Sequence, residues 1–197
     1  MSAVSETIVR EYFELHGFLI RQHRKYIAQT KRENDDVDFF VLNPRSEKRS
    51  LAQPFVLDSA DLKFLKHAVV VVKGWHTETF SSGRLASTPD LFQFVGTKDF
   101  QKQTSQVFGD EAKPANILVV PALPQQQEGR DKSVALLRSK GVDGVIPFST
   151  MLADLVTETE VNRNYQKSDL LQTIRILKNY DFIKDPQMDL FKSRRRR

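Results

Sequence analysis

The run Ala68-Val-Val-Val-Val72, followed by Lys73 and Gly74, constrains the fold more than any other part of the sequence. Five consecutive apolar residues, four of them β-branched, predict a strand that is buried on both faces. Such strands lie in the middle of mixed or parallel sheets. Lys73 comes where this strand would leave the sheet and meet solvent, and it is therefore the first candidate for a functional side chain.

The flanking sequence predicts helices and strands that would surround this central strand. Ser5 is the expected N-cap of a helix over 5–16, and Gly17 ends that helix. Further strands are expected at 18–21, 37–42, 116–121 and 142–148. Further helices are expected at 60–67, 89–109 (divided at Gly96), 132–140 (ended by Gly141), 149–158 (capped by Ser149) and 168–180 (capped by Ser168). Loops are expected at 74–89 and 124–129. Alternation of this kind favours an α/β sandwich with a mixed sheet.

The composition narrows the class of protein. With 197 residues, 40% of them hydrophobic and 28% charged, the chain suits one globular core. The absence of cysteine excludes disulfides, thiolate metal sites and cysteine nucleophiles, and favours a reducing compartment. No run of 18 apolar residues and no charged-then-apolar leader is found, so a cytoplasmic protein without membrane association is expected.

The net charge of +5 comes from the end of the chain, because Lys192 to Arg197 carry five basic side chains. Without those five, 25 basic residues face 25 acidic ones. An arginine run can bind phosphates or an anionic surface. A solubilising end or a cloning remnant would explain it equally well.

Three features then occur in a recognisable order. Glu6 lies in a helix that ends at His16-Gly17-Phe18, Val37-Asp38 begins a strand, and Val71-Val72-Lys73 ends the central one. This order resembles the PD-(D/E)XK, or restriction-endonuclease-like, nuclease superfamily, above all its Holliday-junction-resolvase-like branch. The resemblance covers about residues 5–121. It implies a three-layer core with a central mixed sheet in αβββαβ order, followed by C-terminal helices.

The resemblance also implies a site. In that superfamily a helix glutamate, a strand aspartate and the acid of the (D/E)-X-K strand bind Mg²⁺ or Mn²⁺, while the lysine assists the attacking water. Those roles fall on Glu6, Asp38, position 71 and Lys73. Carboxylate oxygens are the ligands that Mg²⁺ prefers. Residues 71 and 73 point to the same face of a strand.

Position 71, however, is valine, which cannot bind a metal. Either a displaced acid replaces the missing ligand, with Glu78, Glu11 and Asp36 as candidates, or the site is degenerate and the fold binds DNA without cutting it. Glu78 is disfavoured because Gly74 would break the strand before it. DNA contacts would come from the basic side chains Arg21, Arg24, Lys25, Lys31 and Arg32. Of the residues after Lys73, Trp75 is expected to fill the core rather than to form a base-stacking platform, and His76 to lie on the surface rather than to act as a ligand.

The C-terminal segment carries a second resemblance. Gln187-Met188-Asp189-Leu190-Phe191 is similar to the pentapeptide, Gln-Leu-(Ser/Asp)-Leu-Phe, with which bacterial replication and repair proteins bind the sliding clamp. An extended segment after Pro186 would place a leucine–phenylalanine pair in an apolar pocket. The alternative is an amphipathic end that folds back on the core.

Together these patterns predict a nuclease-like core over 1–150, C-terminal helices packed on it over 151–183 and a basic tail over 184–197. The expected function is a Mg²⁺-dependent, endonuclease-like phosphodiesterase in DNA repair or recombination. DNA, a bacterial sliding clamp and a second copy of the chain are the implied partners. The alternatives are a catalytically degenerate DNA-binding module and a clamp-binding adaptor. All depend on one expectation, that Asp38 and Lys73 meet at the ends of adjoining strands.

Overall fold

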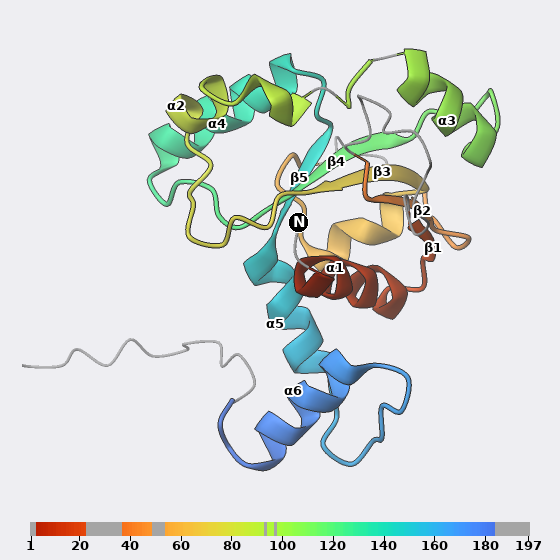
Figure 1. Cartoon of the computed structure of the whole chain (residues 1–197), viewed down its shortest axis with the longest axis vertical. Coiled ribbons are helices and arrows are strands. Elements are labelled where there is room, and N and C mark those ends of the chain that lie inside the picture. The colour runs from red at the N-terminus through yellow and green to blue at the C-terminus, as the bar shows by residue number, and fades with distance from the viewer. Residues whose placement is uncertain (1–2, 23–36, 49–53, 93, 97, 184–197) are drawn as a thin grey trace, which may run out of the picture.

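The computed structural model describes residues 3–22, 37–48, 54–92, 94–96 and 98–183. It is an α/β fold built on one open, mixed sheet of five strands (Figure 1). The strands are β1 (Leu19–Gln22), β2 (Phe39–Leu42), β3 (His67–Val72), β4 (Ala115–Val120) and β5 (Gly144–Pro147). The helices are α1 (Ala3–Leu15), η1 (Ser59–Phe64), α2 (Ser82–Ala86), η2 (Pro89–Phe92), α3 (Lys98–Phe108), α4 (Gln127–Ser139), α5 (Phe148–Glu158) and α6 (Asp169–Asn179).

The strands follow one another across the sheet in chain order, β1-β2-β3-β4-β5. The first three are antiparallel, with Phe39 opposite Val70 in the β2–β3 pair, and β3, β4 and β5 are parallel. The predicted central strand is therefore confirmed: β3 lies between β2 and β4, and its residues from Ala68 to Val72 are buried. The mixed sheet is confirmed as well.

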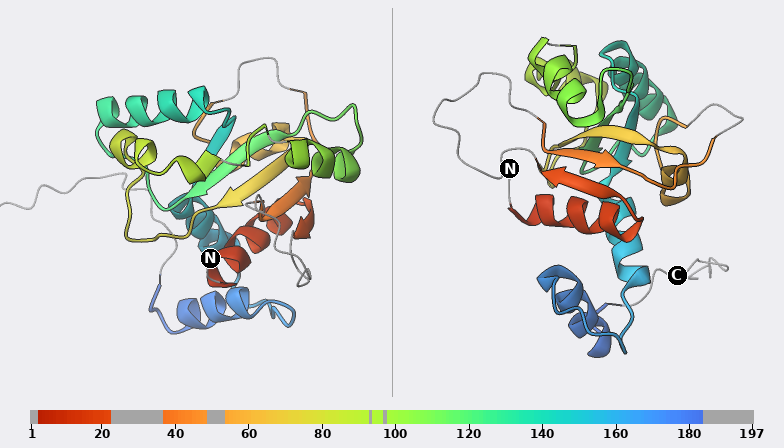
Figure 2. Two further views of the ribbon diagram at one scale, coloured as in Figure 1. Left: turned by 45° about the horizontal axis from the view of Figure 1, so that its top comes forward. Right: turned by 90° about the vertical axis from the view of Figure 1, so that its right-hand side faces the viewer.

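Helices cover both faces of the sheet (Figure 2). Alternate residues of β3 divide between two apolar clusters, as the period-two geometry of a strand requires. Val70 and Val72 pack in the cluster that includes α1 and α5, whereas Val69 and Val71 pack in the cluster that includes α2 and α4. An αβββαβ order with helices on both faces is compatible with a three-layer α/β fold.

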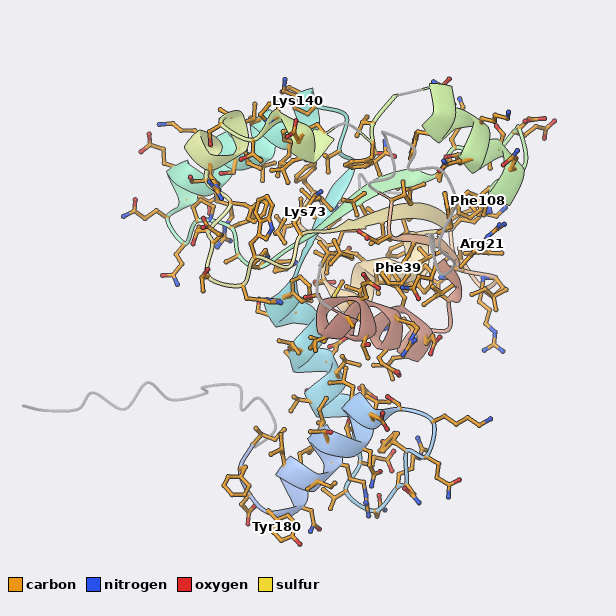
Figure 3. All side chains as sticks on the ribbon, in the orientation of Figure 1. Arg21, Phe39, Lys73, Phe108, Lys140 and Tyr180 are labelled. Atoms are coloured by element: carbon orange, nitrogen blue, oxygen red, sulfur yellow. The ribbon has the colours of Figure 1, made fainter. Side chains whose placement is uncertain are left out.

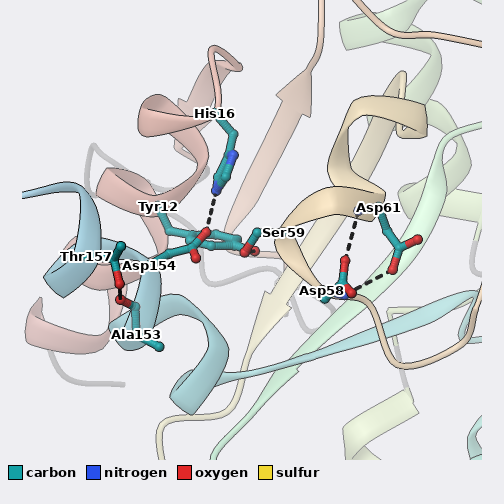
Figure 4. Close-up of polar contacts among 8 residues, drawn as sticks. All are labelled: Tyr12, His16, Asp58, Ser59, Asp61, Ala153, Asp154 and Thr157. Atoms are coloured by element: carbon teal, nitrogen blue, oxygen red, sulfur yellow. Dashed lines mark hydrogen bonds and ion pairs between the residues drawn. The ribbon is translucent and has the colours of Figure 1, made fainter. Parts of the chain in front are cut away.

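Polar contacts fix α1 to its neighbours (Figure 4). The hydroxyl groups of Tyr12 and Ser59 are 3.0 Å apart, and His16 Nε2 is 2.9 Å from the Asp154 carboxylate on α5. Burial raises the pKa of the Tyr12 phenol. Helix α6 lies beyond α5, farther from the sheet (Figure 1), and its buried Ile174 still contributes to the apolar cluster of α1. The C-terminal helices thus continue the core on the α1 side.

Several local predictions are confirmed. Gly17, Gly96 and Gly141 have φ of 77°, 80° and 82°, the left-handed conformation that glycine adopts without strain. Ser168 caps α6 by accepting a hydrogen bond from the Leu171 amide.

Other predictions are wrong at the helix ends. Ser5 is not an N-cap but a fully buried residue inside α1. Ser149 is not a cap either, because α5 begins at Phe148 directly after β5. Helix α4 begins five residues before Lys132, in a segment expected to be a loop, since glutamine and glutamate are good helix formers. Helix α2 also lies in an expected loop, where Ser81 caps it.

Candidate functional site

The predicted site residues come to one edge of the sheet, which we call the polar edge: the first turns of α1, the end of β1, Asp38 and Lys73. Because β3 and β4 are parallel, their C-terminal ends share this edge, and antiparallel β2 begins there. Figure 3 shows Lys73 at the end of β3. In open α/β sheets, ligands bind beyond the C-terminal ends of the strands, close to a change in strand order or direction. The polar edge is such a place.

Asp38 is held by β3 through both its backbone and its side chain. Its amide donates to the Val70 carbonyl at 3.1 Å, and its Oδ2 accepts the Val72 amide at 2.7 Å. The carboxylate thus takes the position that a carbonyl of β2 would occupy if the ladder continued. Two bonds to one strand fix the orientation of the side chain at the start of β2.

The charges around Asp38 act on one another. The pKa of this half-buried carboxyl is raised from 3.8 to about 7, chiefly by burial and in smaller part by the negative charge of Glu6. The hydrogen bond from Val72 and the positive charge of Lys73 act in the opposite direction. A carboxyl group with a strongly shifted pKa, next to a specific cation and a second acid, is typical of functional sites.

Glu6 approaches the site from α1 with a partner that the sequence analysis missed. Gln22, the last residue of β1, donates its Nε2 to Glu6 Oε2 at 2.6 Å. A sequence signal existed, because Gly17 turns β1 back along α1, and Gln22 shares the inward face of β1 with Ile20. The end of β1 therefore lies beside the beginning of α1, and Gln22 orients the glutamate.

Gly74 brings the exit of β3 against the first turns of α1. A Cβ at Gly74 would lie 2.5 Å from Ser5 Oγ, so a larger residue does not fit without displacement. Ser5 Oγ also lies 3.0 Å from His76 Nε2, and the His76 ring packs edge-on against Phe148, with 4.6 Å between the centroids. These contacts fix the distance between α1, which carries Glu6, and the strand that carries Lys73.

Trp75 is not in the core, contrary to the sequence prediction. Its side chain is 40% exposed and stacks on Phe80, with ring centroids 5.8 Å apart. His76 is exposed, as predicted. Phe80, on which Trp75 stacks, is fully buried.

Val71 is fully buried among apolar residues on the α2–α4 side of the sheet. Of its candidate replacements, Glu78 lies 3.5 Å from the Arg84 guanidinium. Glu11 and Glu6 lie on opposite sides of α1. Glu11 lines a cavity of about 460 Å³, together with residues of the segment before α6. Asp36 lies outside the described residues. Within the described ranges, no group of three His, Cys, Asp or Glu side chains is placed to hold a metal ion.

The predicted DNA-binding and partner-binding residues fall mostly outside the described part of the chain. Arg21 is described and exposed on edge strand β1, on the face away from α1 (Figure 3). The segments that were not described contain Arg24, Lys25, Lys31, Arg32, and Gln187, Met188, Asp189, Leu190 and Phe191.

Two further findings concern the protein more generally. In the described residues, no helix is both long enough and apolar enough to span a bilayer. Comparison of the chain with protein-family models, with curated protein sequences and with solved structures found no match in any of the three.

Proposed function

We propose that this chain is a DNA-processing protein with a PD-(D/E)XK-like core that hydrolyses phosphodiester bonds with the help of Mg²⁺ or Mn²⁺. The restriction-endonuclease-like assignment of the fold is part of this proposal. One observation carries it: Asp38, held by the Val72 amide at the end of the central strands, has a carboxyl pKa on which the charges of both Glu6 and Lys73 act. Asp38, Glu6 and Lys73 are the three residues that the resemblance selected from distant parts of the sequence.

The donor set fits a hard divalent cation. Asp38 and Glu6 each accept a hydrogen bond with one carboxylate oxygen, Oδ2 and Oε2 respectively. The second oxygen of each carboxylate would be the ligand. Mg²⁺ is commonly bound by one or two carboxylates, with water and substrate phosphate completing the octahedron. Two acids whose charges repel each other would also gain from a cation between them.

In this proposal each residue has one task. Asp38 and Glu6 hold the cation, which when bound supplies positive charge for the developing phosphorane. Lys73, on the same edge, orients the attacking water or the scissile phosphate through its ammonium group. Gln22 orients Glu6, and the Val72 amide orients Asp38, so that the carboxylates need little reorganisation before substrate binds.

The test is cleavage of linear, nicked and branched DNA by the purified chain with Mg²⁺ or Mn²⁺. Lys73→Ala should abolish cleavage, and Lys140→Ala is the matched control, because Lys140 is an exposed lysine at the end of α4 (Figure 3). Absence of cleavage by the wild-type protein with either metal, or equal cleavage by both variants, would rule out the nuclease proposal.

A second function, DNA binding without cleavage, is favoured by one observation. Val71 replaces the usual acid and is completely buried, and the described residues offer no third carboxylate to Asp38 and Glu6. A binding module of this kind would show affinity for DNA that falls steeply with salt and is unchanged by Asp38→Ala. Metal-dependent cleavage by the wild-type protein would exclude it.

A further inference from the structure

Trp75 is the only tryptophan of the chain, and it lies two residues after Lys73. It is 40% exposed although the sequence around it favoured burial. An exposed indole beside a candidate phosphodiesterase site offers an aromatic surface to a ligand of that site.

The backbone around Trp75 is fixed at both ends of its loop. The Lys73 amide donates to the Val119 carbonyl and the Phe80 amide to the Ala122 carbonyl, each at 2.9 Å. Within the loop, the Glu78 amide donates to the Trp75 carbonyl at 2.8 Å. Both ends are thus attached to β4 or to the residues directly after it.

Side-chain contacts also hold the indole ring. It stacks on fully buried Phe80 at an interplanar angle of 25°. The guanidinium of Arg84, on α2, lies over the indole at 5.5 Å from the ring centroid. Glu78 lies 3.5 Å from Arg84 Nε and holds the guanidinium in place. A preorganised ring of this kind loses little side-chain entropy when a ligand binds.

Flat rings that carry phosphates suit this surface. Arg84, whose side chain is 42% exposed, lies over the indole beside the carboxylate of Glu78. Lys73, two residues before the tryptophan, faces the carboxylates of Asp38 and Glu6. Aromatic rings with a neighbouring arginine are the usual platform for unpaired nucleic-acid bases, whose phosphates contact the cations. Bases inside a duplex are stacked on one another and cannot offer their faces to such a ring.

We propose that the exposed guanidinium of Arg84, lying over Trp75, forms with the indole a platform on which an unpaired base of single-stranded DNA stacks, adjacent to Lys73. This deepens the proposed function, on which its choice of DNA as ligand rests: the substrate would carry unpaired nucleotides next to the phosphate at the polar edge. Stacking is tolerant of sequence because every base has a π-face.

Because the chain has one tryptophan, its fluorescence reports on this platform alone. The experiment titrates wild-type protein, without divalent metal, with oligothymidylate, with an abasic oligonucleotide of the same length and with a blunt-ended duplex. Oligothymidylate should quench the fluorescence saturably. The abasic strand, which offers phosphates without bases, and the duplex should quench it much less.

Affinities are measured in parallel from the fluorescence polarisation of an end-labelled oligothymidylate. Trp75→Ala should weaken binding by between about 5-fold and 150-fold, and Trp75→Phe by less, because phenylalanine retains a stacking face. Tyr180→Ala is the matched control, since Tyr180 is an aromatic residue, 68% exposed, at the end of α6 (Figure 3). It should leave the affinity unchanged, and thermal melting should show that all three variants are folded.

Equal quenching by the abasic strand and oligothymidylate would overturn the proposal, as would equal affinities of Trp75→Ala and Tyr180→Ala, or no binding of single strands. These failures are distinguishable from failure of the nuclease proposal. Cleavage that depends on Lys73 without base-dependent quenching would remove the platform alone, whereas quenching without cleavage in any metal would remove the nuclease alone.

Discussion

The two edges of the sheet each carry an aspartate directly before a strand, and the two differ in their surroundings. Asp38 precedes β2 at the polar edge and accepts the Val72 amide at 2.7 Å. Asp143 precedes β5 at the opposite edge and accepts the Asn116 amide, also at 2.7 Å. Each also donates its own amide to a carbonyl of the neighbouring strand, Val70 or Asn116 respectively.

The hydrogen bonds therefore do not distinguish the two edges, but burial and neighbouring charges do. Asp143 is exposed, whereas Asp38 is half-buried and its pKa is raised to about 7 by burial and by Glu6. An aspartate that only ends a strand ladder needs no such surroundings. The comparison teaches that the polar edge is marked by the coupling of its charges, and the opposite edge by strand capping alone.

The opposite edge also carries a pocket. A cavity of about 600 Å³ lies there, between the beginnings of β3 and β4 and the end of α3. His67 lines it, with its ring 4.9 Å from that of Phe108, and desolvation together with the charge of Lys66 lowers the pKa of His67. A large pocket is the default place to look for a site. Here it contains no coupled acid and base comparable to Asp38 and Lys73.

The largest expected difference between the edges is in DNA cleavage. Asp38→Ala should reduce the rate by about 100- to 1000-fold, because it removes a metal ligand and leaves Lys73 without its acid. Asp143→Ala breaks the same kind of hydrogen bond and should leave the rate within about twofold of wild type. Single-turnover cleavage rates measure both, and equal losses would show that strand capping, not charge coupling, explains the effect.

The two edges should also respond to pH with opposite signs. The Asp38 carboxyl loses its proton near pH 4 when unfolded but near pH 7 when folded, so the folded state binds the extra proton in between. Stability due to Asp38 should therefore fall as pH rises from about 4 to about 7, by on the order of 2–4 kcal/mol, and stay level above.

His67 has a lowered pKa when folded, so its contribution should rise as pH passes upward through that of an unfolded histidine, about 6.5. Urea unfolding of the metal-free protein measures both effects, as the difference between wild type and Asp38→Asn, or wild type and His67→Phe, at each pH. If the free-energy difference from wild type changed with pH in the same direction for both variants, the contrast between the edges would be contradicted.

Substitution of Gly74 should change the free energy of unfolding by a smaller amount. Gly74→Ala places a Cβ 2.5 Å from Ser5 Oγ and should cost about 1–3 kcal/mol, because α1 must move away from the polar edge. Gly83→Ala is the control: it has open space around it inside α2 and should stabilise by about 0.5–1 kcal/mol. Adding Ser5→Ala to Gly74→Ala should restore part of the loss, and failure to do so would place the strain elsewhere.

The smallest effect is expected far from the polar edge, at the other end of α1. Asp154→Asn removes the carboxylate that lies 2.9 Å from His16 Nε2, and the side chains of His16 and Asp154 are 24% and 28% exposed (Figure 4). A partly solvated pair contributes little, so the loss should be about 1 kcal/mol or less, with cleavage unchanged. A thermal melt and a cleavage assay test this; a large fall in cleavage would mean that both ends of α1 act on the site.

The sequence predicted those features that depend on local pattern. The central strand followed from a run of β-branched residues, and the ends at Gly17, Gly96 and Gly141 followed from the conformational freedom of glycine. Features that depend on contacts between distant segments could not be predicted. The hydrogen bond between Gln22 and Glu6 requires that β1 runs back along α1 after the turn at Gly17. The packing of Ser5 on Gly74 requires that α1 lies close to the end of β3.

The exposure of Trp75 shows the same limit. Its apolar character predicted burial, but it is exposed. Trp75 and Phe80 lie five residues apart in one loop, which is attached at both ends to β4 or to the residues directly after it, and Phe80 is the one that is buried.

The order of the strands has a consequence for how the chain forms during synthesis. Each strand pairs with the one before it, so every new strand that leaves the ribosome finds its neighbour already present. Contacts between successive elements also favour rapid folding. A nascent chain that has released about residue 122 already contains Glu6, Asp38, Lys73 and the β4 carbonyls that anchor the Trp75 loop. The residues that bear the proposed chemistry are thus synthesised before α5 and α6, and the polar edge is completed when Phe148, at the start of α5, packs against His76.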